Sequence, residues 1–470
     1  MSALWSLSAH ELARRIAARE VSSREVVDAH LARIEAVNPV VNAIVRVLAD
    51  EARAGADEAD RKVAASEPLG PLHGVPFTVK ENIDFAGLPT TWGVPALAQA
   101  IAPQDAPVVE RMRAAGAIPI GRTNLPDMAL RVHTDSALHG LTRNPWNRSR
   151  TAGGSSGGEA AALATGMSPI GLGNDIGGSL RNPANACGIA SIRPTLGRVP
   201  DAGVIPGEER LVAAQLMNSQ GPMARTVADV RLGLGTLSGA HPRDPWSLDM
   251  PFAGPPISGA IKVAVVPHPP GGSIDPVVAD AVRAAADALA DAGYAVTETC
   301  PPAYAEAAEL WGRFLLGDFA SILPQISAIM SADAMAFLNA AYAQTEPLSD
   351  AAEMSHVLVA RDVIARSWSV FMAEFPLVLT PTWTQLPFAH GFDSASAENS
   401  AATIELMRPV VIANLLGLPS ACVPAGRDEA TGLPIGVLVN GRRFRDDLCL
   451  DAAEAIEARL GLQTPIDPVA

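Results

Sequence analysis

Apolar and polar positions alternate along this chain with two different periods that follow one another repeatedly. Apolar residues three and four positions apart are typical of amphipathic helices, whereas short apolar runs bounded by turn residues are typical of strands. Helices are predicted over residues 50–64, 106–115, 159–165, 226–237, 276–292 and 446–460, and helical sequence dominates residues 303–373. Strands are predicted over residues 74–80, 117–120, 169–172, 261–266, 295–299, 377–379, 420–423 and 435–439. This alternation predicts an α/β fold whose largely parallel or mixed sheet carries helices on its faces.

Two capping-box patterns stand at the start of the chain. Ser8 is followed three residues later by Glu11, and Ser22 is followed by Glu25. In such a pair each side chain binds the backbone of the other residue and opens a helix. We expect the first helix to reach about residue 19 and the second about residue 37, where Asn38-Pro39 stops it.

Composition narrows the class of protein. The 470 residues are 48% hydrophobic, which excludes general disorder, and the formal net charge of −15 argues against binding to nucleic acid or an anionic membrane. No apolar run is long enough to span a bilayer, and the N-terminus does not resemble a secretory signal. The four widely spaced cysteines, Cys187, Cys300, Cys422 and Cys449, are expected to be reduced core residues. Together these features predict a cytoplasmic protein.

The candidate chemistry begins in residues 150–194, where two serines are embedded in glycine. Ser155 lies within residues 153–158 (GGSSGG), and Ser179 follows Gly177-Gly178. Glycines remove side-chain bulk around a hydroxyl group and leave backbone N–H groups free to converge on one point, as an oxyanion hole requires. One such cluster alone would be interpreted as a turn. The pair, with a predicted strand and helix between its members, favours a catalytic site.

Lys80 is the third candidate. The chain has three lysines, and of these Lys62 and Lys262 occupy ordinary exposed positions, whereas Lys80 ends the apolar run 77–79. Burial lowers the pKa of a lysine, and the neutral amine can then act as a general base. The alternative is a lysine at a strand end that extends back to water. The two serines favour the first interpretation.

Other serine chemistries fit the sequence less well. Residues 153–157 match G-x-S-x-G formally, but residues 144–150 before them cannot form the strand that this turn needs. None of the nine histidines has a recognisable catalytic setting, and no serine stands three residues before a lysine. The dinucleotide, Walker and metal-helix patterns are also missing, so we expect neither a cofactor nor a metal.

Several segments together resemble the amidase signature hydrolases. They are residues 74–82 (GVPFTVKEN), 123–124, 153–162 (GGSSGGEAAA), 177–184 (GGSLRNPA), 219–227, 414–419 and 432–436. The resemblance implies one α/β domain over residues 1–470 around a large twisted mixed sheet with helices on both faces. It would comprise N-terminal helices at about 8–64, a core at about 70–240 and a C-terminal α/β part at about 260–470. The Pro- and Gly-rich residues 241–272, otherwise a candidate domain boundary, become a surface connection.

The same resemblance implies roles for individual residues. Ser179 would be the nucleophile, Ser155 the bridging serine after a cis peptide bond, and Lys80 the base. The oxyanion hole would be formed by the backbone N–H groups of Ile176, Gly177, Gly178 and Ser179. The residues expected around this centre are Ser156, Asn174, Asp175 and Arg181. Asn174 departs from the threonine or serine that is usual in the family.

The implied reaction is hydrolysis of the C–N bond of small aryl or hydrophobic amides through an acyl-enzyme. Aryl carbamates (urethanase activity) and esters are further candidate substrates. The candidate pocket residues are Met128, Trp311, Phe314 and Phe319, for which core packing is the alternative. A second possible function is that of an amidotransferase-type chain working with partner chains, which the net charge of −15 disfavours because it would have to approach RNA. We otherwise expect a monomer or homodimer.

Overall fold

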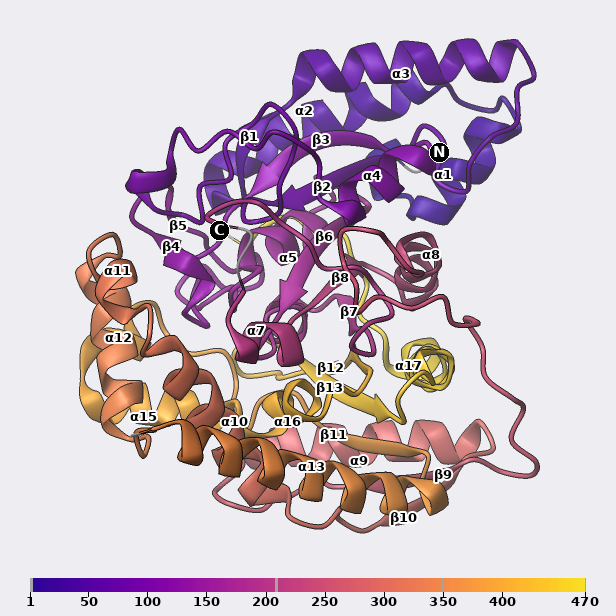
Figure 1. Cartoon of the computed structure of the whole chain (residues 1–470). Helices are drawn as coiled ribbons and strands as arrows, with labels where there is room; N and C mark the ends of the chain where they lie inside the picture. Colours follow the sequence, from indigo (N-terminus) through magenta and orange to yellow (C-terminus); the bar gives the residue numbers. More distant parts are fainter. Residues whose placement is uncertain (1–2, 208–209, 349, 470) are drawn as a thin grey trace.

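A single mixed sheet of eleven strands runs through the computed structural model, which describes residues 3–207, 210–348 and 350–469 (Figure 1). The strand order is β1-β3-β2-β6-β8-β7-β12-β13-β11-β9-β10. These strands are β1 (Ile44–Val47), β2 (Pro76–Lys80), β3 (Ile118–Thr123), β6 (Ile170–Asp175), β7 (Ala190–Arg193), β8 (Ser219–Ala224), β9 (Lys262–Val265), β10 (Ala295–Glu298), β11 (Leu377–Pro381), β12 (Ser420–Arg427) and β13 (Pro434–Gly441). A separate antiparallel pair is formed by β4 (Asp135–Ser136) and β5 (Gly140–Leu141).

The helices connect these strands. They are α1 (Ala9–Ala17), α2 (Ser23–Val41), α3 (Ala49–Ala64), α4 (Pro107–Ala114), α5 (Gly157–Ala164), α6 (Arg181–Cys187), α7 (Val212–Met217), α8 (Val227–Leu237), α9 (Pro276–Asp291), α10 (Tyr304–Phe319), α11 (Leu323–Ser327), α12 (Ala332–Ala343), α13 (Ala351–Glu374), α14 (Phe392–Ala395), α15 (Ala397–Leu406), α16 (Arg408–Leu416) and α17 (Asp446–Leu460). Three short 3₁₀ helices, η1 (Leu4–Ser6), η2 (Pro95–Leu97) and η3 (Asp127–Ala129), complete the described elements.

Helices cover both faces of the sheet, and each face has its own apolar core. One core joins α1, α4, α8, α9 and α17 to strand residues such as Phe77 and Leu172. On the other face, α2, α3, α5 and α6 pack with residues such as Ile120 and Leu438, and α10, α13 and α16 extend this layer over the C-terminal strands. The predicted α/β fold with a mixed, two-sided sheet is therefore confirmed.

The alternation of side chains along β2 decides where its last residue points. Phe77 and Val79 belong to the first core, so Thr78 and Lys80 face the opposite side, where α5 lies. On the neighbouring strand β6, a side chain at Gly171 would overlap Glu159 of α5, and one at Gly173 would lie 2.9 Å from Leu180 and Ser156. Glycine at both positions lets the serine-bearing segments approach the sheet closely.

The predicted helix end at residue 37 is wrong. Helix α2 continues through Pro39 to Val41 and ends at Asn42, which takes a left-handed conformation. Pro39 lies in the last turn, where its missing N–H removes only one backbone hydrogen bond. The capping box at Ser22 and Glu25 is present, whereas at the first helix only the Ser8 side chain makes its capping bond.

Three strands of the large sheet, β1, β7 and β8, were not predicted from the sequence, nor was the short pair β4 and β5. Strand β8 reads SQGPMA, which carries neither an apolar run nor a β-branched residue. Its neighbours β6 and β7 bury it on both edges, so tertiary pairing outweighs its weak propensity. Strand β6 also runs three residues further than predicted, to Asp175.

Two further sequence expectations concern the whole chain. All four cysteines are unpaired thiols, and three of them, Cys187, Cys422 and Cys449, are buried while Cys300 is partly exposed. Among the described residues, no helix combines the length and apolar character needed to cross a membrane.

Candidate active site

Lys80, the last residue of β2, is fully buried. Its Nζ lies 2.7 Å from the Ser155 hydroxyl oxygen and 2.8 Å from the Asn174 Oδ1. Burial lowers the pKa of Lys80 to about 7, although the carboxylates of Asp175 and Glu159 act in the opposite direction. A substantial fraction of this lysine is therefore neutral near pH 7, with its amine in contact with a serine hydroxyl.

Asn174 is itself held in place by Asn82. The Asn174 Nδ2 donates to the Asn82 Oδ1 at 3.0 Å, and the Asn82 Nδ2 donates back to the Asn174 Oδ1 at 3.3 Å. This reciprocal amide pair directs the Asn174 carbonyl oxygen toward Lys80. An amide oxygen can only accept a hydrogen bond, so it orients the lysine amine without adding a charge.

The segment around Ser155 approaches its neighbours closely. The peptide bond between Gly154 and Ser155 is cis, as the family resemblance implied. A side chain on Gly154 would lie 2.7 Å from the Arg131 carbonyl oxygen, so only glycine fits there. The Ser156 N–H donates to the Ser179 carbonyl oxygen at 3.3 Å, which brings the two serine segments together.

Ser179 lines a cavity of about 640 Å³. The cavity wall includes Ile176, Gly177 and Ser179. The four N–H groups expected to form the oxyanion hole are not equivalent, because the Gly178 N–H donates to the Asp175 carboxylate at 2.7 Å. In the described part of the chain the N–H groups of Ile176, Gly177 and Ser179 have no protein acceptor. The candidate hole therefore has three free donors.

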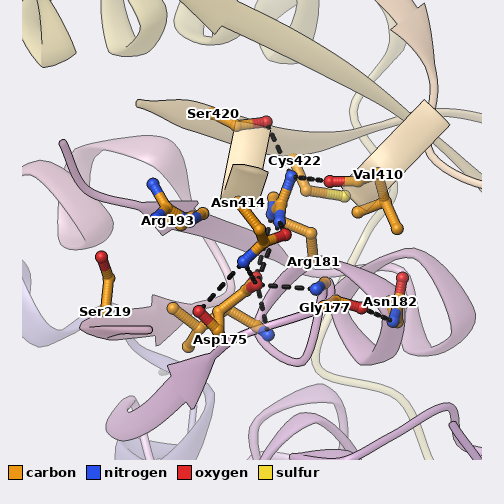
Figure 2. Close-up of polar contacts among 12 residues, drawn as sticks. Asp175, Gly177, Arg181, Asn182, Arg193, Ser219, Val410, Asn414, Ser420 and Cys422 are labelled. Atoms are coloured by element: carbon orange, nitrogen blue, oxygen red, sulfur yellow. Dashed lines mark hydrogen bonds and ion pairs between the residues drawn. The ribbon is translucent and has the colours of Figure 1, made fainter. Parts of the chain in front are cut away.

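Asp175 organises the loop that carries these donors (Figure 2). Its carboxylate accepts the N–H groups of Gly178 and Leu180 and pairs in bidentate fashion with Arg181, at 2.9 and 3.0 Å. Asn414 donates to the same carboxylate at 2.7 Å and accepts from Arg181 at 2.7 Å. Burial alone would raise the pKa of Asp175, but the Arg181 charge outweighs burial and lowers it well below its usual range. Asp175 is thus a fixed anion.

The cavity contains only one of the four predicted pocket side chains. Trp311 of α10 lines it, together with Leu315, Leu316 and Phe337. Phe314, by contrast, is fully buried in the core beneath α10, and Met128 and Phe319 pack against the small core of α11 and α12. Spacing along α10 does not separate them, since Phe314 and Leu315 lie three and four residues after Trp311 and flank it on the helix surface; the packing of α10 against its neighbours turns Phe314 into the core.

Sequence reasoning gave no role to three residues that contact the centre. Asn82 and Asn414 lie in the segments that carry the family resemblance, but their partners are distant in sequence and no local pattern reveals them. Glu159 is buried and accepts hydrogen bonds from Thr78 and Thr123, and burial raises its pKa to about 7. In the sequence, only the position of Glu159, a single acid at the start of an otherwise alanine-rich helix, could have pointed to it.

The chain is similar to known proteins in both sequence and structure. The Amidase family model matches residues 25–450. The chain is 43% identical over 462 residues to an indoleacetamide hydrolase of Bradyrhizobium diazoefficiens, covering 98% of this chain and 87% of the relative. It is 34% identical over 482 residues to a glutamyl-tRNA(Gln) amidotransferase subunit of a Synechococcus species, covering 95% and 96%. A bacterial aryl acylamidase structure superposes with a TM-score of 0.81 at 27% identity, covering 97% of each chain.

The Asp175–Arg181 ion pair gives a prediction about stability. Replacing Arg181 with methionine leaves a buried carboxylate without its counter-ion, which costs about 3–5 kcal/mol. For a chain of this length we expect the thermal midpoint to fall by roughly 3–5 °C. The control is Arg283→Met, which removes an exposed pair with Asp280 and should cost less than about 1 kcal/mol. Equal melting of both variants in a calorimeter would contradict the structural role of the pair.

Proposed function

The chain belongs to the amidase signature family of hydrolases, and we propose that it cleaves the C–N bond of small aryl or hydrophobic amides with Ser179, Ser155 and Lys80. One observation carries the proposal, namely that a fully buried lysine amine lies 2.7 Å from the Ser155 hydroxyl, while the neighbouring Ser156 N–H bonds the backbone of Ser179, which lines the cavity. Burying an amine costs folding free energy, and a buried titratable group with a shifted pKa beside a hydroxyl is typical of a functional site.

The mechanism begins with neutral Lys80. It accepts a proton from Ser155 as Ser155 accepts one from Ser179, and the Ser179 oxygen attacks the amide carbonyl. Among the described residues no hydrogen bond joins the two serine hydroxyls directly, so the Ser179 side chain rotates toward Ser155 when substrate binds, as apo sites often require. The free N–H groups of Ile176, Gly177 and Ser179 stabilise the oxyanion.

The proton then returns along the same path. Lys80 gives it back through Ser155 to the amide nitrogen, which leaves as a neutral amine and breaks the C–N bond. Water attacks the acyl-enzyme in the second half, and its proton follows the relay to Lys80 and back to the Ser179 oxygen. The acid product is released with the site unchanged.

The cavity supports aryl or hydrophobic acyl groups. Trp311, Leu315, Phe337 and Val411 give its wall apolar patches beside charged side chains such as Glu309 and Arg313, and a volume of about 640 Å³ accommodates a small aromatic group. The similarity to an indoleacetamide hydrolase supports arylacetamides as the first substrates to test. Aryl carbamates and aryl esters remain part of the proposal. A panel of indole-3-acetamide, anilides, aryl carbamates and p-nitrophenyl esters, with product acids measured by chromatography, decides among them.

A second candidate function is that of an amidotransferase component, which the similarity to the amidotransferase chain of Synechococcus supports. That function needs partner chains and an approach to RNA, which a net charge of −15 opposes. Amide hydrolysis by the purified chain alone favours the hydrolase, whereas activity that appears only with added amidotransferase partners favours the second function.

Replacing Ser179 with alanine removes the attacking oxygen. We expect kcat to fall by about 10³-fold or more while the fold is retained, because no other group can form the acyl-enzyme. Ser191→Ala is the control, since its buried hydroxyl has no partner among the described side chains. Mass spectrometry of the chain quenched during turnover should find the acyl adduct on the peptide that contains Ser179. An active Ser179→Ala variant excludes the nucleophile assignment.

Lys80 determines the predicted pH dependence. Its amine must be neutral to accept a proton, so kcat/KM should fall as pH drops through about 7, the pKa of Lys80, and level off above it. Lys80→Arg should be as inactive as Lys80→Met, because a guanidinium stays protonated. The matched control is Lys262→Arg at an exposed position, which should keep full activity. A Lys80→Arg enzyme with normal turnover at pH 7 would refute the role of base.

Asn174 gives a separate prediction about how kcat/KM falls at low pH. In Asn174→Asp, a carboxylate replaces the amide 2.8 Å from the lysine amine and should raise the pKa of Lys80 by about 1–3 units. The acid limb should move to higher pH by that amount. The existing charges of Asp175 and Glu159, and Arg122 beside the Lys80 carbonyl, are unchanged in this variant. A profile superposable on that of the wild type would show that Asn174 does not set the lysine pKa.

A further inference from the structure

Trp311 makes a contact that the mechanism above does not use. Its indole Nε1 donates a hydrogen bond to the Ile176 carbonyl oxygen at 3.0 Å. Trp311 lies on α10, which also supplies much of the cavity wall, whereas Ile176 begins the loop that carries the candidate oxyanion donors. One side chain thus joins the substrate cavity to the catalytic loop.

Because the peptide unit is planar, the hydrogen bond from Trp311 also determines the direction of the neighbouring Gly177 N–H. In a planar trans peptide the C=O and N–H bonds point in opposite directions. The Ile176–Gly177 peptide is not among the cis bonds of the chain. Holding the Ile176 carbonyl toward Trp311 therefore directs the Gly177 N–H away from the Trp311 indole. That N–H is one of the three without a protein acceptor in the described residues.

The next peptide of the loop is held in a similar way. The Gly177 carbonyl accepts from the Asn182 side chain at 3.0 Å, and the Gly178 N–H opposite it donates to Asp175 at 2.7 Å. Both groups of this peptide are thus fixed by protein partners. In the Ile176–Gly177 peptide only the carbonyl is fixed, by Trp311, and the N–H remains available for a ligand.

The Trp311 indole packs closely against Gly177. A side-chain carbon at Gly177 would lie 2.5 Å from Cζ2 of Trp311, too close for any residue but glycine unless the ring moved. The ring therefore lies directly against the backbone whose carbonyl it holds. Because the same ring lines the cavity, an acyl group packed on it adds to the contacts that keep the ring in place.

We propose that Trp311 is a positioning residue that orients the Gly177 N–H of the oxyanion hole and links acyl-group binding to the orientation of that donor. This inference rests on the proposed amidase function. Its consequence is that a good acyl group raises kcat as well as lowering KM, since the donor matters most when charge develops on the substrate oxygen.

The decisive variant is Trp311→Phe, which keeps an aromatic wall and loses the N–H donor. Complete loss of one oxyanion donor costs about 10²–10³-fold. A donor that remains but is less well oriented should cost less, and we expect kcat to fall roughly 5- to 50-fold with KM changed by less than about threefold. The comparison variant is Leu316→Ala, which enlarges the same cavity from the same helix and should act mainly on KM. A Trp311→Phe enzyme with unchanged kcat overturns the proposal.

Inhibitor binding gives a second test, because a Trp311 that serves only as part of the cavity wall would affect charged and neutral ligands equally. An arylalkyl boronic acid adds to a serine nucleophile and places a tetrahedral, negatively charged group in the oxyanion hole, whereas the matching neutral alkylbenzene only fills the cavity. Trp311→Phe should weaken boronate binding by the same factor as kcat/KM and leave alkylbenzene binding nearly unchanged, both by calorimetry. Equal weakening of both ligands would assign Trp311 to the pocket wall alone. Failure of the amidase function itself looks different, because the wild-type chain would then neither turn over amides nor bind the boronate.

Discussion

The buried ion pair between Asp175 and Arg181 is the interaction on which the site depends. It spans the end of β6 and the start of α6, so it fixes the ends of the turn that carries Ser179. Two unpaired charges in this position would be very costly, and the pair is tolerated because its hydrogen-bonding groups are satisfied. Arg181 also donates to the Val410 carbonyl and the Ser420 hydroxyl, at 2.7 and 3.2 Å. These partners and Asn414 come from α16 and β12, so the C-terminal half of the chain completes the support of a loop in the N-terminal half (Figure 2).

The position of Lys80 depends on a second constraint, the close approach of α5 to the sheet. Strand alternation sends Lys80 to the α5 side, and glycines at 171 and 173 allow the serine-bearing segment to lie directly against it. The neighbouring acid, Glu159, is held by two threonine hydroxyls and has its pKa raised to about 7 by burial. A raised carboxyl pKa weakens the acid's ability to hold Lys80 in its protonated form. Burial therefore acts on both groups in the direction that favours a neutral amine.

How much could be predicted from the sequence depends on whether an interaction involves residues close together or far apart along the chain. The glycine-flanked serines and the lysine at the end of an apolar run are local signals, and the structure brings Lys80 and Ser155 into contact. The pair of Asn82 and Asn174 and the support from Asn414 depend on strand order, which no local pattern encodes. The pocket residues could be predicted only in part, for a related reason. Trp311 and Phe314 are both large and apolar, but which of them faces the cavity is decided by the rotation of α10 on its neighbours.

The proposed catalytic residues and most of the cavity wall belong to different parts of the fold. Lys80, Ser155 and the loop with Ser179 are held by the sheet, α5, α6 and the Asp175 network, whose members are buried and fully bonded. Much of the cavity wall comes instead from α10, α12 and α16, of which α10 and α16 pack over the C-terminal strands while α12 packs against α14 and α15 (Figure 1). Side chains that line the cavity on α10, α12 and α16 can change without removing a partner of Asp175 or Arg181, whereas Asn414, also on α16, belongs to the buried network. Trp311 touches both parts, because it lines the cavity and donates a hydrogen bond to the loop that carries Ser179, so we expect a change there to affect substrate binding and turnover together.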